Sequence, residues 1–294
     1  MSKNNHKLDF INIGAPRSGT TWLFENLNKH PDICIPKEKD LRFFVKRYWG
    51  FKHKKTQNFR GIEWYIEKFT ACPKNKIKGE VATLYLYDEK SASEIYEHFG
   101  KIKILVCLRD PIERLWSDYR RSLHKYNLPG LQETLETYPK YRDAGLYHHH
   151  LSKFIEIFGE DNILIIPFQK IKMQPREILK DVYNFLEVET QYKSSILSKK
   201  INKINKQILL DKLTHYSQEK LLFSFFLRKL ISLKITKKII YYIEYVIPDR
   251  NQTINKNTTN KLFEYYKKDY YALSEFYGGD LGFDTMKKID EEKR

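Results

Sequence analysis

The chain has 294 residues and a formal net charge of +16, and 41% of its residues are hydrophobic and 15% aromatic. This composition excludes a disordered or collagen-like chain, and at this length a globule buries about 75% of its unfolded surface. The excess of Lys and Arg favours polyanionic partners such as nucleic acid, an anionic glycan, a phosphorylated cofactor or an anionic membrane surface.

The chain shows neither a leader nor a membrane span. Its first residues, MSKNNHKLD, lack the apolar segment of a signal peptide, and no window holds 18 uncharged apolar residues. The three cysteines, Cys34, Cys72 and Cys107, have neither paired nor metal-ligand spacing, so we expect reduced, buried thiols. These observations predict a cytoplasmic protein.

The first informative stretch is LDFINIGAPRSGTTWLFENL, residues 8–27. Its apolar start predicts a buried strand, Gly14 to Gly19 a tight turn, and the spacing of apolar residues after Thr20 a helix. Such a turn aims backbone N–H groups and the positive end of the helix at an anion. The spacing G-x-x-x-x-G is typical of phosphate loops, but Thr20 stands where nucleotide-binding proteins place a Lys that reaches the outer phosphates. This argues against ATP or GTP, and Arg17 places a cation inside the loop instead.

The string GAPRSGTTWL resembles the 5′-phosphosulfate loop of sulfotransferases that use 3′-phosphoadenosine 5′-phosphosulfate (PAPS). The resemblance covers residues 8–190 well and 259–285 loosely. Golgi members of that family carry a membrane anchor, so the chain would be either cytoplasmic or a trimmed catalytic domain. The resemblance implies that the cofactor is bound by Arg17, Ser18, Gly19, Thr20, Thr21 and Trp22, with Trp22 stacked on adenine.

The segment KDLRFF, residues 39–44, resembles the K-E-x-[HR]-[FY]-F segment of carbohydrate sulfotransferases, whose Glu is the candidate general base. Asp40 takes that position and is one methylene shorter. Glu38 stays an alternative, His124 is the next candidate, and a solvated loop without a catalytic role is also consistent with the charges. Some glycan sulfotransferases have a second catalytic Lys where this chain has Val81. This difference argues against a catalytic site with two lysines in this chain.

The second informative stretch is KIKILVCLRDPIERLWSDYRRS, residues 101–122. Its apolar run predicts a strand buried on both faces of a parallel sheet, and Asp110 with Pro111 predicts a helix start. A helix that leaves the carboxyl end of a central strand directs its first turn at the ligand crevice. The string resembles the 3′-phosphate site of the same family, which implies that Arg109 and Ser117 hold that phosphate. For Arg114 we expect a structural ion pair rather than a ligand contact.

The remaining chain is less informative. The consecutive residues His148 to His150 would point in different directions on a helix, and no acidic cluster is visible, so no metal site is predicted. Residues 191–258 are basic with helical periodicity. They either form a packed helix with a solvated Lys face, or they hold substrate or contact a membrane surface. Lys256 is a candidate for a loop that closes over the nucleotide. A final helix is expected from residue 259 to 277, ended by Gly278 and Gly279.

Together these features predict one α/β domain over residues 1–294, with a P-loop-like, mostly parallel sheet and helices on both faces. The resemblance implies a sulfotransferase that moves a sulfuryl group from PAPS, leaving 3′-phosphoadenosine 5′-phosphate (PAP), to a hydroxyl or amine of an acceptor, with Asp40 and Arg17 as catalytic residues. The K-D-L-R-F-F match favours a glycan acceptor. A small-molecule P-loop kinase and a basic nucleic-acid binder are the alternatives, although the chain contains no recognisable RNA- or DNA-binding module.

Overall fold

The computed structural model describes residues 8–46, 57–126, 128–197 and 254–293. Their centre is a five-stranded sheet in the order β2-β3-β1-β4-β5, and every pair of neighbouring strands is parallel. The strands are β1 (Phe10–Asn12), β2 (Ile33–Cys34), β3 (Ile77–Val81), β4 (Lys103–Leu108) and β5 (Ile163–Pro167). The prediction of a parallel α/β sheet is confirmed.

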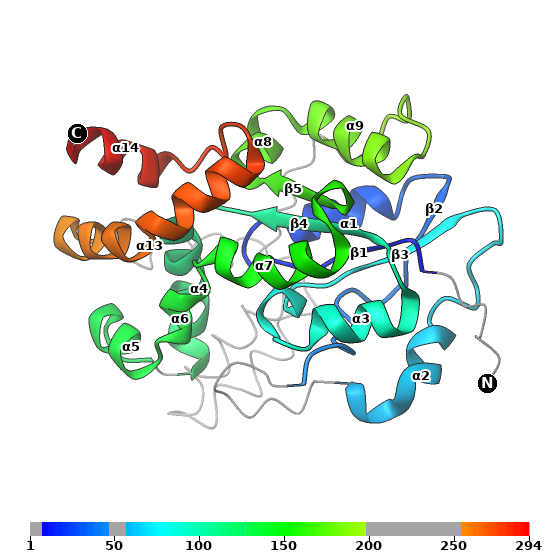
Figure 1. The fold of residues 1–294 in the computed structure, drawn as a ribbon, viewed down its shortest axis with the longest axis horizontal. Helices are drawn as coiled ribbons and strands as arrows, with labels where there is room; N and C mark the ends of the chain where they lie inside the picture. The colour runs from blue at the N-terminus through cyan, green and yellow to red at the C-terminus, as the bar shows by residue number, and fades with distance from the viewer. Residues whose placement is uncertain (1–7, 47–56, 127, 198–253, 294) are drawn as a thin grey trace, which may run out of the picture.

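Helices cover both faces of this sheet (Figure 1). The described helices are α1 (Thr20–Leu27), α2 (Gly61–Glu67), α3 (Ser91–Phe99), α4 (Pro111–Tyr126), α5 (Leu131–Thr137), α6 (Lys140–Asp143), α7 (Tyr147–Phe158), α8 (Phe168–Met173), α9 (Pro175–Leu186), α13 (Lys256–Tyr277) and α14 (Asp284–Lys293), with short 3₁₀ turns at Asn58–Arg60, Tyr85–Tyr87 and Glu160–Asn162.

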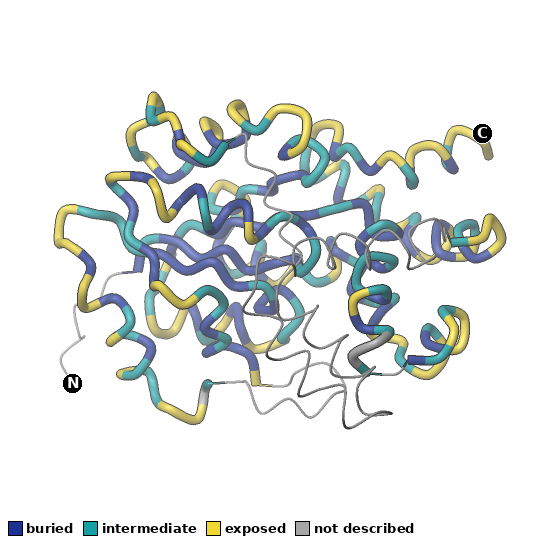
Figure 2. Tube along the Cα trace, turned by 180° about the vertical axis from the view of Figure 1, so that it is seen from behind, coloured by how far each residue is buried: buried dark blue, intermediate teal, exposed yellow. Residues whose placement is uncertain are grey.

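Strand β4 shows how the sequence builds the two layers. Ile104, Val106 and Leu108 belong to a core with residues of α3, α7 and α13, whereas Leu105 and Cys107 belong to a second core with residues of α1 and α9. This alternation follows from the period of two in a strand, and it explains why β4 reads as an uninterrupted apolar run. The strands form the buried centre in Figure 2, with exposed residues on the outer turns of the helices.

The order of the strands reverses between β1 and β4. From β1 the chain crosses to β2 on one side of the sheet, and from β4 it continues to β5 on the other side. In an open parallel sheet, ligands bind at the carboxyl ends of the two strands where the order reverses. The loops after β1 and β4 are the two stretches that the sequence singles out.

The chain end packs back onto the start of α4. The carboxylate of Asp110 accepts hydrogen bonds from the backbone of Ile112 and Glu113 at 3.0 and 3.1 Å, as predicted for a helix-capping acid. Its second oxygen accepts from the N–H of Met286 in α14 at 3.0 Å. One buried carboxylate therefore bonds to the first turns of two helices, and it lies 176 residues before Met286 in sequence. Helix α13 ends at Gly278, as predicted.

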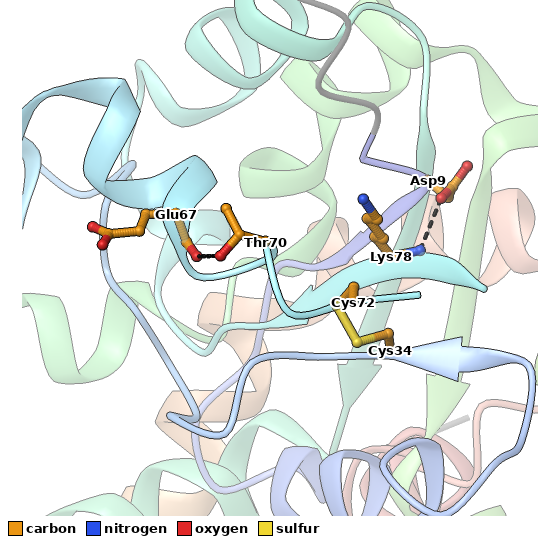
Figure 3. The surroundings of a disulfide bond; sticks show 6 residues. All are labelled: Asp9, Cys34, Glu67, Thr70, Cys72 and Lys78. Atoms are coloured by element: carbon orange, nitrogen blue, oxygen red, sulfur yellow. Dashed lines mark hydrogen bonds between the residues drawn. A yellow bond between two sulfur atoms is a disulfide. The ribbon is translucent and has the colours of Figure 1, made fainter. Parts of the chain in front are cut away.

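The expectation of three free thiols is wrong. Cys34 at the end of β2 and Cys72 in the loop before β3 form a disulfide, while Cys107 is free and buried (Figure 3). β2 pairs in parallel with β3, so the 38-residue excursion between the cysteines returns its end beside its start. Spacing alone did not reveal this pairing because it depends on how the chain folds back.

Two further expectations concern regions of the chain as a whole. Most of the basic segment 191–258 lies outside the described residues, so its assignment stays a prediction. Within the described ranges, no helix combines the length and the hydropathy needed to cross a bilayer.

Candidate functional site

The loop after β1 has the backbone geometry of a candidate anion site. The N–H of Ala15 bonds to the carbonyl of Cys107 at 2.8 Å, which holds the start of the loop beside the end of β4. Gly19 precedes α1 with a φ of 99°, and a Cβ there would lie 2.8 Å from a methyl group of Ile171. The first turn of α1 contains no acidic residue and no capping side chain. Its N–H groups and the positive helix end are therefore available to an anion.

Arg17 lies inside this loop with a left-handed backbone, φ 70°. Its Nε donates a hydrogen bond of 3.0 Å to the hydroxyl of Ser117 in α4. Burial lowers the pKa of Arg17, and the nearby guanidinium groups of Arg121 and Arg109 act in the same direction, against one opposing carboxylate, Asp118. Three guanidinium groups therefore lie near one another here, as expected of a site for a polyanion.

The other predicted residues of the loop differ in exposure. Ser18 is fully buried and Thr20 nearly so, whereas Thr21 is exposed. The side chain of Trp22 is only 9% exposed and packs in the core shared with α9. The structure thus places most of Trp22 in the protein interior, and its stacking on adenine stays a prediction.

The predicted 3′-phosphate residues lie on the neighbouring strand and helix. Arg109 follows β4, and its guanidinium donates to Glu113 at 2.7 and 3.0 Å and lies 4.9 Å from the ring of Phe168. Ser117 is two turns further along α4, where it meets Arg17. Arg114 is fully buried, donates to the carbonyl of Tyr141 at 2.8 Å and lies 3.6 Å from the carboxylate of Asp118, which fits the expected structural role.

The carboxylate of Asp40 is held from two sides. Its Oδ1 accepts from both the backbone N–H and the hydroxyl of Thr83 at 3.0 Å, and its Oδ2 accepts from Nε of Arg42 at 2.7 Å. An ionised carboxylate offers about four lone-pair sites, so three donors leave one for a substrate hydroxyl. The alternative base, Glu38, is 66% exposed and pairs with Lys68 at 3.0 Å.

Backbone strain gathers at this site. Within the described residues, four that are not glycine have a positive φ, and three of them are Arg17, Asp40 and Arg42. Such conformations persist only where the surroundings hold them, and they concentrate where a side chain has a function. The strained residues thus lie in the same two segments that the sequence motifs select, which are the loop after β1 and the KDLRFF segment.

A buried carboxylate that the sequence analysis passed over supports the Asp40 segment. Glu80, at the end of β3, accepts hydrogen bonds from the hydroxyls of Tyr65 and Tyr85 at 2.8 and 2.9 Å and from the N–H of Leu41 at 2.9 Å. Burial raises the pKa of Glu80 to about 7 although these donors oppose the shift. Through its bond to the N–H of Leu41, Glu80 therefore holds the backbone next to Asp40 in place. Its place in the string GEVATLY was the available signal.

Lys39 is the second residue whose place only the structure reveals. Its ammonium group donates to the hydroxyls of Thr20 and Thr21 at 3.2 and 3.0 Å, so the segment of the candidate base contacts the phosphate loop. The signal in the sequence was the Lys that precedes the acid in the KDLRFF segment.

The structure does not bring Lys256 to the other predicted residues. This side chain is 81% exposed at the start of α13, and its described partner is Glu292 at 3.5 Å. The side chain of His124 lies outside the described residues. No group of three or more His, Cys, Asp and Glu residues in the described part of the chain is arranged for a metal ion.

The known proteins to which this chain is similar are sulfotransferases. A family model described as "Sulfotransferase domain" matches residues 7–226. The membrane-associated sulfotransferase kil1 of Dictyostelium discoideum is 33% identical over 118 residues, which are 39% of this chain and 23% of that protein. Heparan sulfate glucosamine 3-O-sulfotransferase 5 of Mus musculus is 27% identical over 192 residues, which are 60% of this chain and 53% of that protein. The chain thus spans about half the length of this relative, and less of the first.

A solved structure extends the match to the fold. The sulfotransferase from Alicyclobacillus acidocaldarius superimposes with a TM-score of 0.68, covering 93% of this chain and 97% of that one at 20% identity. At this identity the likeness concerns the arrangement of strands and helices, and it agrees with the parallel sheet described above.

Proposed function

Because this chain belongs to the family of sulfotransferase domains, we propose that it transfers a sulfuryl group from PAPS to a hydroxyl or amine of an acceptor. The observation that carries the proposal is the bond of 3.0 Å between Arg17 and Ser117. It joins the proposed 5′-phosphate loop after β1 to the proposed 3′-phosphate position after β4, and few cofactors carry phosphate groups at both the 5′ and the 3′ position.

The residues present fit such a cofactor. The first turn of α1 offers uncapped N–H groups to a 5′-phosphate, and Arg17 adds a charged donor. Arg109 and Ser117 suit the 3′-phosphate, one through its guanidinium and one through its hydroxyl. Arg109 would exchange part of its contact with Glu113 for the ligand. We leave Lys256 out of the proposed site because its described contact is with α14.

The proposed chemistry divides between two side chains. The bound donor supplies the sulfuryl group and a phosphate on which negative charge accumulates. Arg17 and the N–H groups of Thr20 and Thr21 stabilise this charge from fixed positions, which is usually the largest contribution to such catalysis. Asp40 accepts the proton of the acceptor hydroxyl at its remaining lone-pair site.

For the acceptor we propose a carbohydrate. The KDLRFF segment, the net charge of +16 and the likeness to heparan sulfate sulfotransferases support a glycan with anionic groups. Nucleic acid is not proposed as a partner, since the basic residues accompany no nucleic-acid-binding module. Contact with a membrane surface stays a proposal that concerns the segment 191–258.

The compartment is tied to the disulfide. The expectation of a cytoplasmic protein relied in part on three reduced thiols, and the bond between Cys34 and Cys72 removes that part of its support. Disulfides persist mainly in oxidising environments. We therefore propose an oxidising compartment rather than the cytoplasm, on the support of this bond.

The experiment is a screen of candidate acceptors with radiolabelled PAPS, together with calorimetric binding of PAP. We expect binding of PAP without Mg²⁺ and label transfer to at least one glycan. Binding of ATP with Mg²⁺ in place of PAP would instead support the small-molecule kinase, and retention of nucleic acid on filters at physiological salt would support the nucleic-acid binder.

A further inference from the structure

Lys39 contacts the phosphate loop at the residue where the loop itself lacks a lysine. Thr20 stands at the position that carries Lys in nucleoside triphosphate-binding loops. The Nζ atom of Lys39 lies 3.2 Å from the Thr20 hydroxyl and 3.0 Å from the Thr21 hydroxyl. A cation thus reaches this position from a different segment of the chain.

We propose that Lys39 is a second cation of the 5′-phosphate site, which contacts the 5′-phosphate of the bound nucleotide together with Arg17. This inference rests on the proposed function and adds to it a residue that the loop motif does not contain. An ammonium group has three N–H donors, and the two threonine hydroxyls use two of them. The third donor remains for a ligand oxygen.

The surroundings of Lys39 suit an anionic partner. Burial lowers the pKa of Lys39, Arg121 acts in the same direction, and the neighbouring Asp40 is the main opposing charge. Asp40, however, is already bonded to Arg42 and Thr83. Glu25 contributes a weaker attraction. A partly buried ammonium whose nearest carboxylate already has other donors gains from a phosphate, because a charge-assisted bond offsets its lost hydration.

The residue after Glu80 in β3 does not provide this cation. The residue there is Val81, which is buried in the core against α1 and α9. Strand β3 therefore directs no cation from this position to the ligand. Lys39 supplies the charge instead, and it directly precedes the candidate base, Asp40. Adjacent residues of one segment would then contact the donor nucleotide and the acceptor.

The test compares two nucleotides that differ only at the 5′ position. Calorimetry is done with PAP and with adenosine 3′-monophosphate, on the wild type, Lys39→Met, Lys39→Arg and the control Lys37→Met. Lys37 is exposed and two residues away on the same segment. We expect Lys39→Met to weaken PAP by about 10- to 100-fold, the range for loss of a charged hydrogen bond. Adenosine 3′-monophosphate should bind unchanged, Lys39→Arg should keep most affinity for PAP, and Lys37→Met should match the wild type.

A second measurement uses the unaltered protein. Lysine labelling read by mass spectrometry should show Lys39 protected by PAP and not by adenosine 3′-monophosphate, with Lys37 labelled throughout. Unchanged PAP affinity in Lys39→Met, equal loss for both nucleotides, or labelling of Lys39 in the presence of PAP would overturn the inference while leaving the proposed function intact. A wild-type protein that binds no PAP would overturn both.

Discussion

The guanidinium of Arg17 and the hydroxyl of Ser117 are joined by a hydrogen bond of 3.0 Å across 100 residues of sequence. The contact connects the loop after β1 to the helix after β4, so the two candidate phosphate positions share one side-chain contact. Loss of the Ser117 hydroxyl should therefore also remove a bond that holds Arg17.

The first prediction concerns Arg17. Arg17→Ala should lower kcat by about 100- to 1,000-fold, the usual cost of removing one donor from a site of developing charge. The affinity for PAP should fall much less, because the α1 N-terminus and the 3′ contacts remain. Transfer from radiolabelled PAPS and calorimetry with PAP measure the two effects. An unchanged kcat with weakened binding would show that Arg17 only binds.

The 3′ contacts make a second prediction. Arg109→Ala should weaken PAP by about 10- to 100-fold and leave adenosine 5′-monophosphate unchanged, since a charged hydrogen bond to the 3′-phosphate is lost. Ser117→Ala should act in the same direction and also release Arg17. Glu113→Gln is the matched control: it removes the carboxylate that competes for Arg109, so PAP should bind at least as tightly. Equal binding of the two nucleotides by the wild type would refute the assignment.

The third prediction separates the two candidate bases. Asp40→Asn should abolish most transfer and preserve PAP affinity, because the amide has the same shape but does not accept the proton. Glu38→Gln should have little effect, since that side chain is exposed and paired with Lys68. Asp40→Glu should retain activity, and it tests whether a carboxylate that is one methylene longer also reaches the acceptor hydroxyl. Initial rates with the acceptor from the screen decide, and an inactive Glu38→Gln beside an active Asp40→Asn would move the base to Glu38.

A fourth prediction follows from the buried Glu80. Burial raises its pKa to about 7 in the folded protein, above the ordinary value of 4.5. Between these values the folded state binds more protons than the unfolded state, so this group's stabilising contribution is full below pH 4.5 and is lost as the pH rises through 7. Denaturant unfolding of the wild type and Glu80→Gln at pH 5 and pH 8 should show a difference in free energy that changes by on the order of 1–3 kcal/mol. Parallel pH curves for the two proteins would contradict this prediction.

The disulfide provides the fifth prediction. Reduction should lower the free energy of unfolding by about 2–4 kcal/mol, the usual contribution of a bridge that closes a loop of this size. Cys34→Ser should lose its response to reductant, whereas Cys107→Ala should keep it because Cys107 is free. Thiol titration of the denatured, unreduced protein should find one reactive cysteine. Three reactive cysteines in freshly purified protein would refute the bridge.

The local sequence determined the elements that carry the site. The glycine loop, the apolar run of β4 and the Asp110–Pro111 helix start each depend on neighbouring residues, through backbone conformation, strand periodicity and capping. The parallel sheet could therefore be predicted, and the order of the strands placed the two candidate anion positions after neighbouring strands. The prediction of three free thiols from cysteine spacing was wrong because Cys34 and Cys72 come together only when β2 pairs with β3.

Only the tertiary structure decided which side chains meet. The contact between Arg17 and Ser117, the support of Leu41 by Glu80, and the reach of Lys39 to Thr20 each join segments from different strands of the sheet. Periodicity reports which face a residue occupies, and it contains no information on the distance between residues in separate segments. These distances follow from the packing of helices on the sheet, which brings the loop after β1, the segment after β2 and helix α4 to one edge.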